Sequence, residues 1–294
     1  MNYPRVTRAL CGLMILAAIL ATGCSRPRLS LEPQAKASAD ATLRLGQNLE
    51  QRHNFPDAAQ TYNSALAQYR VFADPAGQMY ALAGLARIKY LQSDTAAFTE
   101  YREQMQTLAT KVDPETQCIL DLLDIYILHH QGRFEEILKL ATDNLDYPPG
   151  IRMQILTYKL QADSYLNPGM DSQTSKNLES LSGKYKSRLR TDFVADPIVL
   201  ASAYYALAYN YFLQERYPQA LKNIDAALTW DYRYENFPGL GYAYWLKGQI
   251  VAKQGDKPQA ISNLYKAREI FSSYANDTML NKTDQLLKAL EVTP

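Results

Sequence analysis

Two consecutive stretches in the last third of the chain place similar residues at equal intervals, and this repeat constrains the fold more than any other feature. The first runs from Tyr204 to Ala227 and the second from Tyr244 to Ala267. The matched pairs are Tyr204 with Tyr244, Ala208 with Gly248, Tyr211 with Val251, Ala220 with Ala260, Ile224 with Leu264, and Ala227 with Ala267. A small residue is needed where two helices cross closely, so each stretch predicts a hairpin of two helices.

The residues between the two helices of each hairpin favour the same interpretation. Gly255 accepts the left-handed conformation that ends a helix, and Asp256 can cap the next one. Pro218 and Pro258 fall near a helix start, where a missing N–H costs nothing. The pattern resembles the tetratricopeptide-repeat (TPR) family, although Lys247 stands where leucine is usual. The resemblance implies an α-solenoid that binds partners, and it does not identify them.

Residues 39–190 carry four weaker copies of this pattern. Successive copies along the whole chain are spaced by 37 to 46 residues, and the second follows the first by 38. The first copy has Leu45, Gly46, Ala58, Tyr62 and Ala65 at matched positions, and the second has Tyr80 and Gly84 but puts Glu100 and Glu103 at core positions. The third has the turn Gln131–Gly132, and the fourth has Tyr158, Ala162, Tyr165, Leu178 and Leu181. The register of the second and fourth copies stays open.

The last 104 residues, 191–294, hold the two clear hairpins and one more helix. This helix, expected over Thr278–Glu291, carries leucines that would cover the apolar face of the sixth hairpin, as a terminal repeat requires. A seam between weaker and stronger units is predicted over Thr191–Pro197. We therefore expect an all-α fold, a TPR-like α-solenoid of about six helical hairpins with a C-terminal capping helix.

The beginning of the chain has the pattern of a secretory signal. Arg5 and Arg8 precede the apolar run Ala9–Ala21, and small residues stand immediately before Cys24. The run is too short for a comfortable membrane span. The stretch 20–24 resembles a bacterial lipobox, with alanine at −3 where leucine is usual. The resemblance implies that residues 1–23 are a lipoprotein signal peptide and that Cys24 becomes the lipid-modified N-terminus.

Ser25 follows the modified position rather than aspartate, so the resemblance implies the outer membrane, facing the periplasm of a bacterial cell envelope. An ordinary cleaved signal or a short anchor with an incidental cysteine is the alternative. Residues 24–38 contain Pro27 and Pro33 without apolar periodicity, which indicates a flexible tether between lipid and folded body.

Charge and cysteine content exclude several classes of function. Loss of residues 1–23 removes two of the 31 Lys and Arg residues and none of the 30 Asp and Glu residues, which leaves 29 against 30. A near-neutral chain has no general electrostatic attraction for nucleic acid. Cys24 would carry the lipid, so Cys118 is the one thiol left and no internal disulfide can form. The apolar neighbours of Cys118 indicate a core position.

No catalytic, cofactor or metal motif is found. The three histidines are His53, His129 and His130, and neither a zinc-protease motif nor a phosphate-binding glycine loop is present. His129 and His130 end a predicted helix, where a cation would complement the helix dipole. We therefore expect no enzymatic activity, no cofactor and no metal.

The aromatic residues provide the candidate binding site. In the TPR family, one face of each first helix lines a concave groove. The positions carried over in the two clear hairpins include Tyr205, Tyr209, Phe212, Tyr242 and Trp245. Tyr and Trp dominate interface hot spots, so this stripe predicts a surface for a protein or peptide partner. Packing of the stripe against the C-terminal helix or a neighbouring hairpin is the alternative.

These observations predict a lipid-anchored scaffold or adaptor that binds a protein at the cell envelope without catalysis. The Lys and Asn of the carboxylate clamp found in some TPR proteins are absent, so that binding mode is rejected. Two alternatives remain open. One is a peptidoglycan- or glycan-associated envelope protein, because exposed aromatic rings also stack on sugars. The other is an accessory subunit of an export or assembly machine. Fold resemblance alone does not choose among them.

Overall fold

The computed structural model describes residues 34–110, 114–144, 146–189 and 196–292. Within them the fold is all-α, as expected, with thirteen helices and no strand. The helices are α2 (Gln34–Gln51), α3 (Phe55–Val71), α4 (Pro75–Leu91), α5 (Thr95–Ala109), α6 (Pro114–His130), α7 (Phe134–Leu140), α8 (Pro149–Leu166), α9 (Gln173–Arg188), α10 (Pro197–Leu213), α11 (Tyr217–Arg233), α12 (Phe237–Lys253), α13 (Lys257–Ser273) and α14 (Asp277–Val292). Cys24, the signal segment and most of the tether lie outside these residues.

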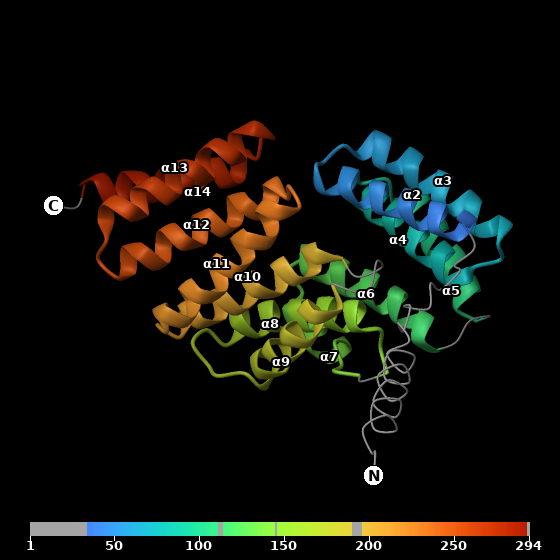
Figure 1. Ribbon diagram of the computed structural model, residues 1–294, viewed down its shortest axis with the longest axis horizontal. Helices are drawn as coiled ribbons and strands as arrows, with labels where there is room; N and C mark the ends of the chain where they lie inside the picture. The colour runs from blue at the N-terminus through green and yellow to red at the C-terminus, as the bar shows by residue number, and fades with distance from the viewer. Residues whose placement is uncertain (1–33, 111–113, 145, 190–195, 293–294) are drawn as a thin grey trace, which may run out of the picture.

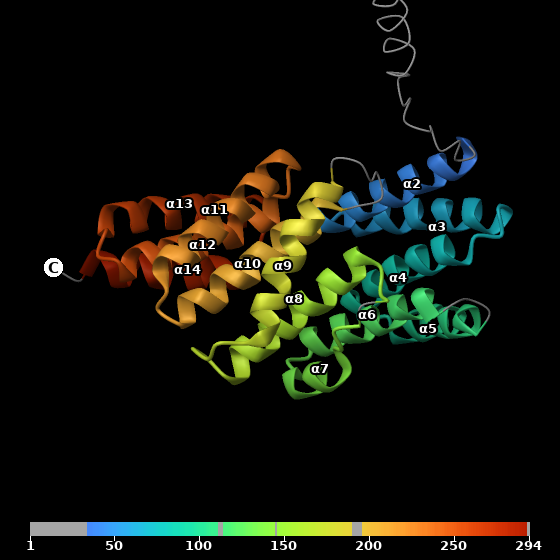
Figure 2. The same ribbon diagram turned by 60° about the horizontal axis from the view of Figure 1, so that its bottom comes forward.

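The helices pack in consecutive pairs, from α2 with α3 to α12 with α13, and α14 packs on α13. The even-numbered helices α2 to α12 also contact one another in order, so they form one layer, and the odd-numbered helices lie against them. Figures 1 and 2 show the result as a curved array with α2–α5 and α12–α14 on opposite sides of α6–α10. No helix of the described residues is long and apolar enough to cross a membrane.

A left-handed residue ends the first helix of most hairpins at a regular interval. His53, Ser93, Gly132, Glu215 and Gly255 have φ between 57° and 88°, and their positions differ by 40, 39, 83 and 40 residues. The chain then reverses within three residues, so each second helix lies beside its first. Three of these five residues are not glycine, so the glycines of the sequence indicated only the turns at Gly132 and Gly255.

The turns fix the register of the second hairpin, which the sequence left open. With Ser93 equivalent to His53, the hairpin begins 40 residues after the first rather than 38. Glu100 and Glu103 are then exposed, and the core position that the sequence pattern assigned to Glu103 falls on the buried Met105. The sequence pattern placed these acidic residues in the core because it was aligned two residues out of phase, whereas they lie on the solvent face of α5.

The close helix crossings lie where the small residues predicted them. A Cβ on Gly46 would lie 2.8 Å from the Tyr62 ring, and a Cβ on Gly248 would lie 2.8 Å from Leu264 Cγ. Ala208 and Ile224, which take the equivalent positions in the fifth hairpin, have no exposed surface. Interiors are packed too tightly to absorb an added methyl group at such contacts.

Two apolar clusters make up the core of the described residues, and α8 contributes to both. Ile151, Ile155 and Ala162 pack in one apolar cluster with α2–α6, whereas Met153 and Leu160 pack in a second cluster with α9–α14. Most of the predicted seam, residues 191–195, lies outside the described residues. Cys118 is 1% exposed, which confirms its core position.

The third hairpin departs most from the others because α7 has seven residues. Residues 141–144 and 146–148 are not helical, and polar contacts hold Asp143 in place. Arg152 Nε donates to Asp143 Oδ1 at 2.6 Å, and Asn177 donates to Asp143 Oδ2 at 2.6 Å. Pro148 and Pro149 lead directly into α8, where they provide a fixed backbone at the helix start.

Candidate partner-binding surface

The predicted stripe on α10 is present as one half-buried face. Tyr205, Tyr209 and Phe212 each retain partial exposure, whereas Leu207 and Ala208 on the packing face have none. Burial raises the pKa of the Tyr205 and Tyr209 phenols, so both remain neutral at physiological pH. The face is therefore apolar and uncharged, with hydroxyl groups able to donate or accept hydrogen bonds.

Tyr242 and Trp245 continue this face on α12. The Tyr242 ring lies edge-on to Tyr205 at 6.4 Å between centroids and edge-on to Phe271 at 5.3 Å. It is 37% exposed. Trp245 is half-buried, and no described residue offers its buried Nε1 a hydrogen-bond acceptor. The five predicted residues thus pack partly on their neighbours while keeping exposed edges.

A second group of aromatic residues, which the sequence analysis missed, covers the N-terminal even-numbered helices. The group consists of Tyr90 on α4, Tyr126, His129 and His130 on α6, and Tyr158 and Tyr165 on α8. Tyr90 meets His130 with centroids 6.3 Å apart, and Tyr126 meets Tyr158 at 6.5 Å. These contacts join α4 to α6 and α6 to α8. We call this group and the five predicted residues together the aromatic face.

The structure corrects the position of Tyr165. The fourth copy of the pattern placed Tyr158, Ala162 and Tyr165 in the packing face, but Tyr165 is 66% exposed, and its ring lies 4.3 Å from Phe134. Ala162, by contrast, is fully buried as expected. The i, i+7 spacing of Tyr158 and Tyr165 could have indicated a shared face of α8, but the degenerate register hid which face it was.

The histidines are also corrected, because they are not cations at a helix end. His129 lies 5.1 Å from the Tyr158 ring and 5.9 Å from Phe134, and burial lowers its pKa to about 4. His130 lies 4.5 Å from Tyr126, and burial lowers its pKa as well. Both imidazoles are therefore neutral at pH 7 and extend the uncharged aromatic face.

One ion pair lies at the N-terminal end of this face. Arg87 donates through Nε and Nη2 to the two carboxylate oxygens of Glu50, each at 2.8 Å, and the Tyr62 hydroxyl donates to the same carboxylate at 2.5 Å. The Arg87 guanidinium also lies 5.9 Å from the Tyr126 ring centroid. The pair joins α2, α3 and α4, and its charges cancel.

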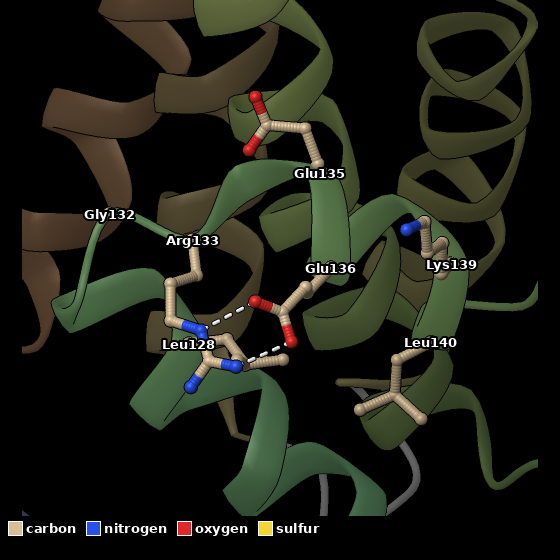
Figure 3. Close-up of a pocket in the computed structure, with 7 residues that line it drawn as sticks. All are labelled: Leu128, Gly132, Arg133, Glu135, Glu136, Lys139 and Leu140. Carbon is tan, nitrogen blue, oxygen red and sulfur yellow. Dashed lines mark hydrogen bonds and ion pairs between the residues drawn. The ribbon is translucent and has the colours of Figure 1, made fainter.

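A hollow of about 740 Å³ lies elsewhere, beside the short helix α7. Its wall includes Leu128, Gly132, Glu135, Lys139 and Leu140. Arg133 and Glu136 also line it, and Figure 3 shows them paired with each other at the start of α7. Because these charges neutralise each other, the hollow has no free charge from that pair to hold an ion. No group of three or more His, Cys, Asp or Glu residues in the described part of the chain is arranged to hold a metal ion.

Comparison with known proteins returns no match, either to a protein-family model or to a curated protein.

Proposed function

We propose that the chain is a TPR-like scaffold, anchored in a bacterial outer membrane through lipid on Cys24, that binds an uncharged segment of a protein partner along its aromatic face. The TPR-like assignment is supported by the paired helices, the turn interval of about 40 residues, and the matching Gly46–Tyr62 and Gly248–Leu264 crossings. The anchor is supported by the sequence around Cys24 alone.

The observation that carries the binding proposal is the extent of the aromatic face. Ring contacts join α4 to α6, α6 to α8, and α10 to α12, so aromatic side chains follow the layer of even-numbered helices rather than one repeat. A surface of this length suits an extended segment or a helix of a partner. Repeat proteins use such long surfaces for binding.

The chemistry of the face favours an uncharged segment. Burial keeps the Tyr205 phenol and the His129 imidazole uncharged at pH 7, and Arg87 is already paired with Glu50. A charged ligand would lose hydration without gaining an opposite charge, whereas apolar and aromatic side chains would lose little. In this proposal the protein acts by binding its partner and catalyses no reaction itself.

The test is photo-crosslinking in native cells, with a photoreactive phenylalanine in place of Tyr165, Tyr209 or Trp245. Lys282, which is exposed on α14, is the control position. We expect one dominant protein adduct from the three positions and none from Lys282. Intramolecular adducts at all three, or adducts equal to the control, would contradict the proposal.

Two further measurements address the anchor and the glycan alternative. Metabolic labelling with a clickable palmitate analogue should mark the wild-type protein and not Cys24→Ser, and membrane fractionation should follow the label. Pull-down with purified peptidoglycan fragments should recover no more wild-type protein than a triple variant with Tyr165, Tyr209 and Tyr242 changed to alanine. Recovery of the wild type alone would favour the glycan role instead.

A further inference from the structure

The turn of the first hairpin contacts the fifth and sixth hairpins, far along the chain. Arg52 Nη2 lies 3.1 Å from Glu235 Oε2, although 183 residues separate the two. The neighbouring His53 ring stacks on Tyr274, with centroids 5.5 Å apart and planes 14° apart. Figure 1 shows the end of α2 approaching the group of α12, α13 and α14.

Three turns meet at this point, and each carries a left-handed residue. His53 ends the turn after α2, Glu235 the turn after α11, and Ala275 the turn after α13, with φ between 53° and 57°. Asn48 and Gln51 face Tyr234, Asn236 and Pro238 across a recess of about 30 Å³. Such a recess holds about one water molecule, so the two sides meet directly and leave no room for a larger ligand.

The contact is continuous with the aromatic face. Tyr274 lies 6.2 Å from Phe271, Phe271 lies 5.3 Å from Tyr242, and Tyr242 lies 6.4 Å from Tyr205. A chain of rings therefore runs from His53 to the stripe on α10. Movement of the first hairpin away from Tyr274 would uncover one end of this chain.

The composition of the contact indicates that it opens readily. The Arg52 and Glu235 side chains are 52% and 69% exposed, and exposed ion pairs contribute little to stability. The His53–Tyr274 stack adds one aromatic contact. By contrast, the helix pairs of the array bury continuous apolar cores. The end-to-end contact is therefore the part of the curved array that breaks first.

We propose that Arg52–Glu235 and His53–Tyr274 form a latch that closes the curved array and that opens to admit the partner segment to the aromatic face. The admission of a partner, which we call the gating step, rests on the proposed function. The existence of closed and open states of the array does not depend on it. A partner that binds the open array more tightly than the closed one shifts the population toward the open state.

The test measures opening directly, by energy transfer between two dyes on the full chain. Dyes are coupled to azidophenylalanine in place of Gln60 on α3 and Glu269 on α13, both exposed and outside the latch. We expect Arg52→Glu and His53→Ala each to lower the transfer efficiency, because the first hairpin moves away. The charge swap Arg52→Glu with Glu235→Arg should restore it.

A matched control is the exposed pair Lys176–Asp171, whose side chains are 59% and 55% exposed. Lys176→Glu should leave the transfer efficiency unchanged. Equal efficiency in wild type, Arg52→Glu and His53→Ala would overturn the latch. So would equal losses in Arg52→Glu and Lys176→Glu, because charge reversal anywhere would then have the same effect.

The gating step is tested by repeating the Tyr209 photo-crosslinking in the latch variants. We expect the yield of partner adduct to rise at least threefold in Arg52→Glu and to return to the wild-type yield in the charge swap. Opening by energy transfer with an unchanged adduct yield would keep the latch and overturn its role as a gate. Absence of any adduct in every variant would contradict the proposed function and leave the energy-transfer result standing.

Discussion

Arg87 and Glu50 form a two-point ion pair, in which each carboxylate oxygen accepts one guanidinium N–H at 2.8 Å. The side chains are 23% and 13% exposed, so neither is well hydrated once its partner is lost. The Tyr62 hydroxyl completes the group by donating to Glu50, and Tyr62 itself fills the crossing at Gly46. Charge pairing and helix packing thus depend on the same three helices.

Removal of Arg87 should therefore lower the free energy of unfolding by more than the Arg87–Glu50 ion pair adds to it. We expect Arg87→Met to lower the free energy of unfolding by about 3–5 kcal/mol, because Glu50 is left as an uncompensated charge. Arg87→Met with Glu50→Gln should recover at least half of the loss. Urea unfolding followed by circular dichroism measures both. Arg133→Met, at an exposed ion pair, is the control and should lower the free energy of unfolding far less than Arg87→Met.

Gly248 should not tolerate a side chain, whereas Gly183 should. A Cβ at Gly248 would lie 2.8 Å from Leu264 Cγ and 3.2 Å from the Ala260 carbonyl oxygen, so Gly248→Ala should destabilise by about 1–3 kcal/mol. Gly183 is a helical glycine on α9 with open space around its Cβ position, so Gly183→Ala should stabilise by about 0.5–1 kcal/mol. Thermal unfolding of both variants gives the comparison, and equal effects would contradict the packing argument.

Acidification should destabilise the protein through His129. Its pKa is about 4 in the folded chain and 6.5 when exposed, so the unfolded chain binds the proton more readily. This contribution to stability is complete above pH 6.5 and is lost as the pH falls toward 4, by on the order of 1–3 kcal/mol.

Replacement of His129 by phenylalanine removes this titration. The stability of His129→Phe should vary less between pH 6.5 and 4 than that of the wild type, as measured by urea unfolding across this range. An identical pH dependence in wild type and His129→Phe would contradict the burial of a neutral imidazole.

Asp231 should give the opposite dependence on pH. The carboxyl is 3% exposed, burial raises its pKa to about 7, and Asn236 donates to it at 2.7 Å. Its folded pKa is above the ordinary value of 3.8, so its contribution is complete below pH 3.8 and is lost as the pH rises through 7, by on the order of 2–4 kcal/mol.

The variant Asp231→Asn keeps an oxygen for Asn236 and removes the charge. Its unfolding free energy should exceed that of the wild type by an amount that grows from pH 4 to pH 7. Asp225→Asn, at an exposed position that pairs with Lys247, is the control and should show no such growth. A constant difference between wild type and Asp231→Asn would contradict the raised pKa.

The sequence predicted the local features of the fold because short-range interactions determine them. The small residues Ala208 and Gly248 predicted the helix crossings. The spacing of Tyr205, Tyr209 and Phe212 predicted a second face of α10, separate from the packing face. The sequence did not predict which face of α8 carries Tyr165, because the register of this degenerate repeat allows either the packing face or the exposed face. The turns at Ser93 and Glu215 were hidden for a related reason, because their left-handed conformation falls on residues other than glycine.

The sequence by itself thus determined that the chain is all-α, which residues pair its helices, and where one part of the aromatic face lies. The tertiary structure alone decided that His129 and His130 are neutral, that residues of five helices contribute to the aromatic face, and that Arg52 reaches Glu235. Periodicity reports interactions a few residues apart, which recur in every repeat. The curvature of the array is a sum of small rotations between successive hairpins, so contacts across 183 residues follow from the whole array and not from any local pattern.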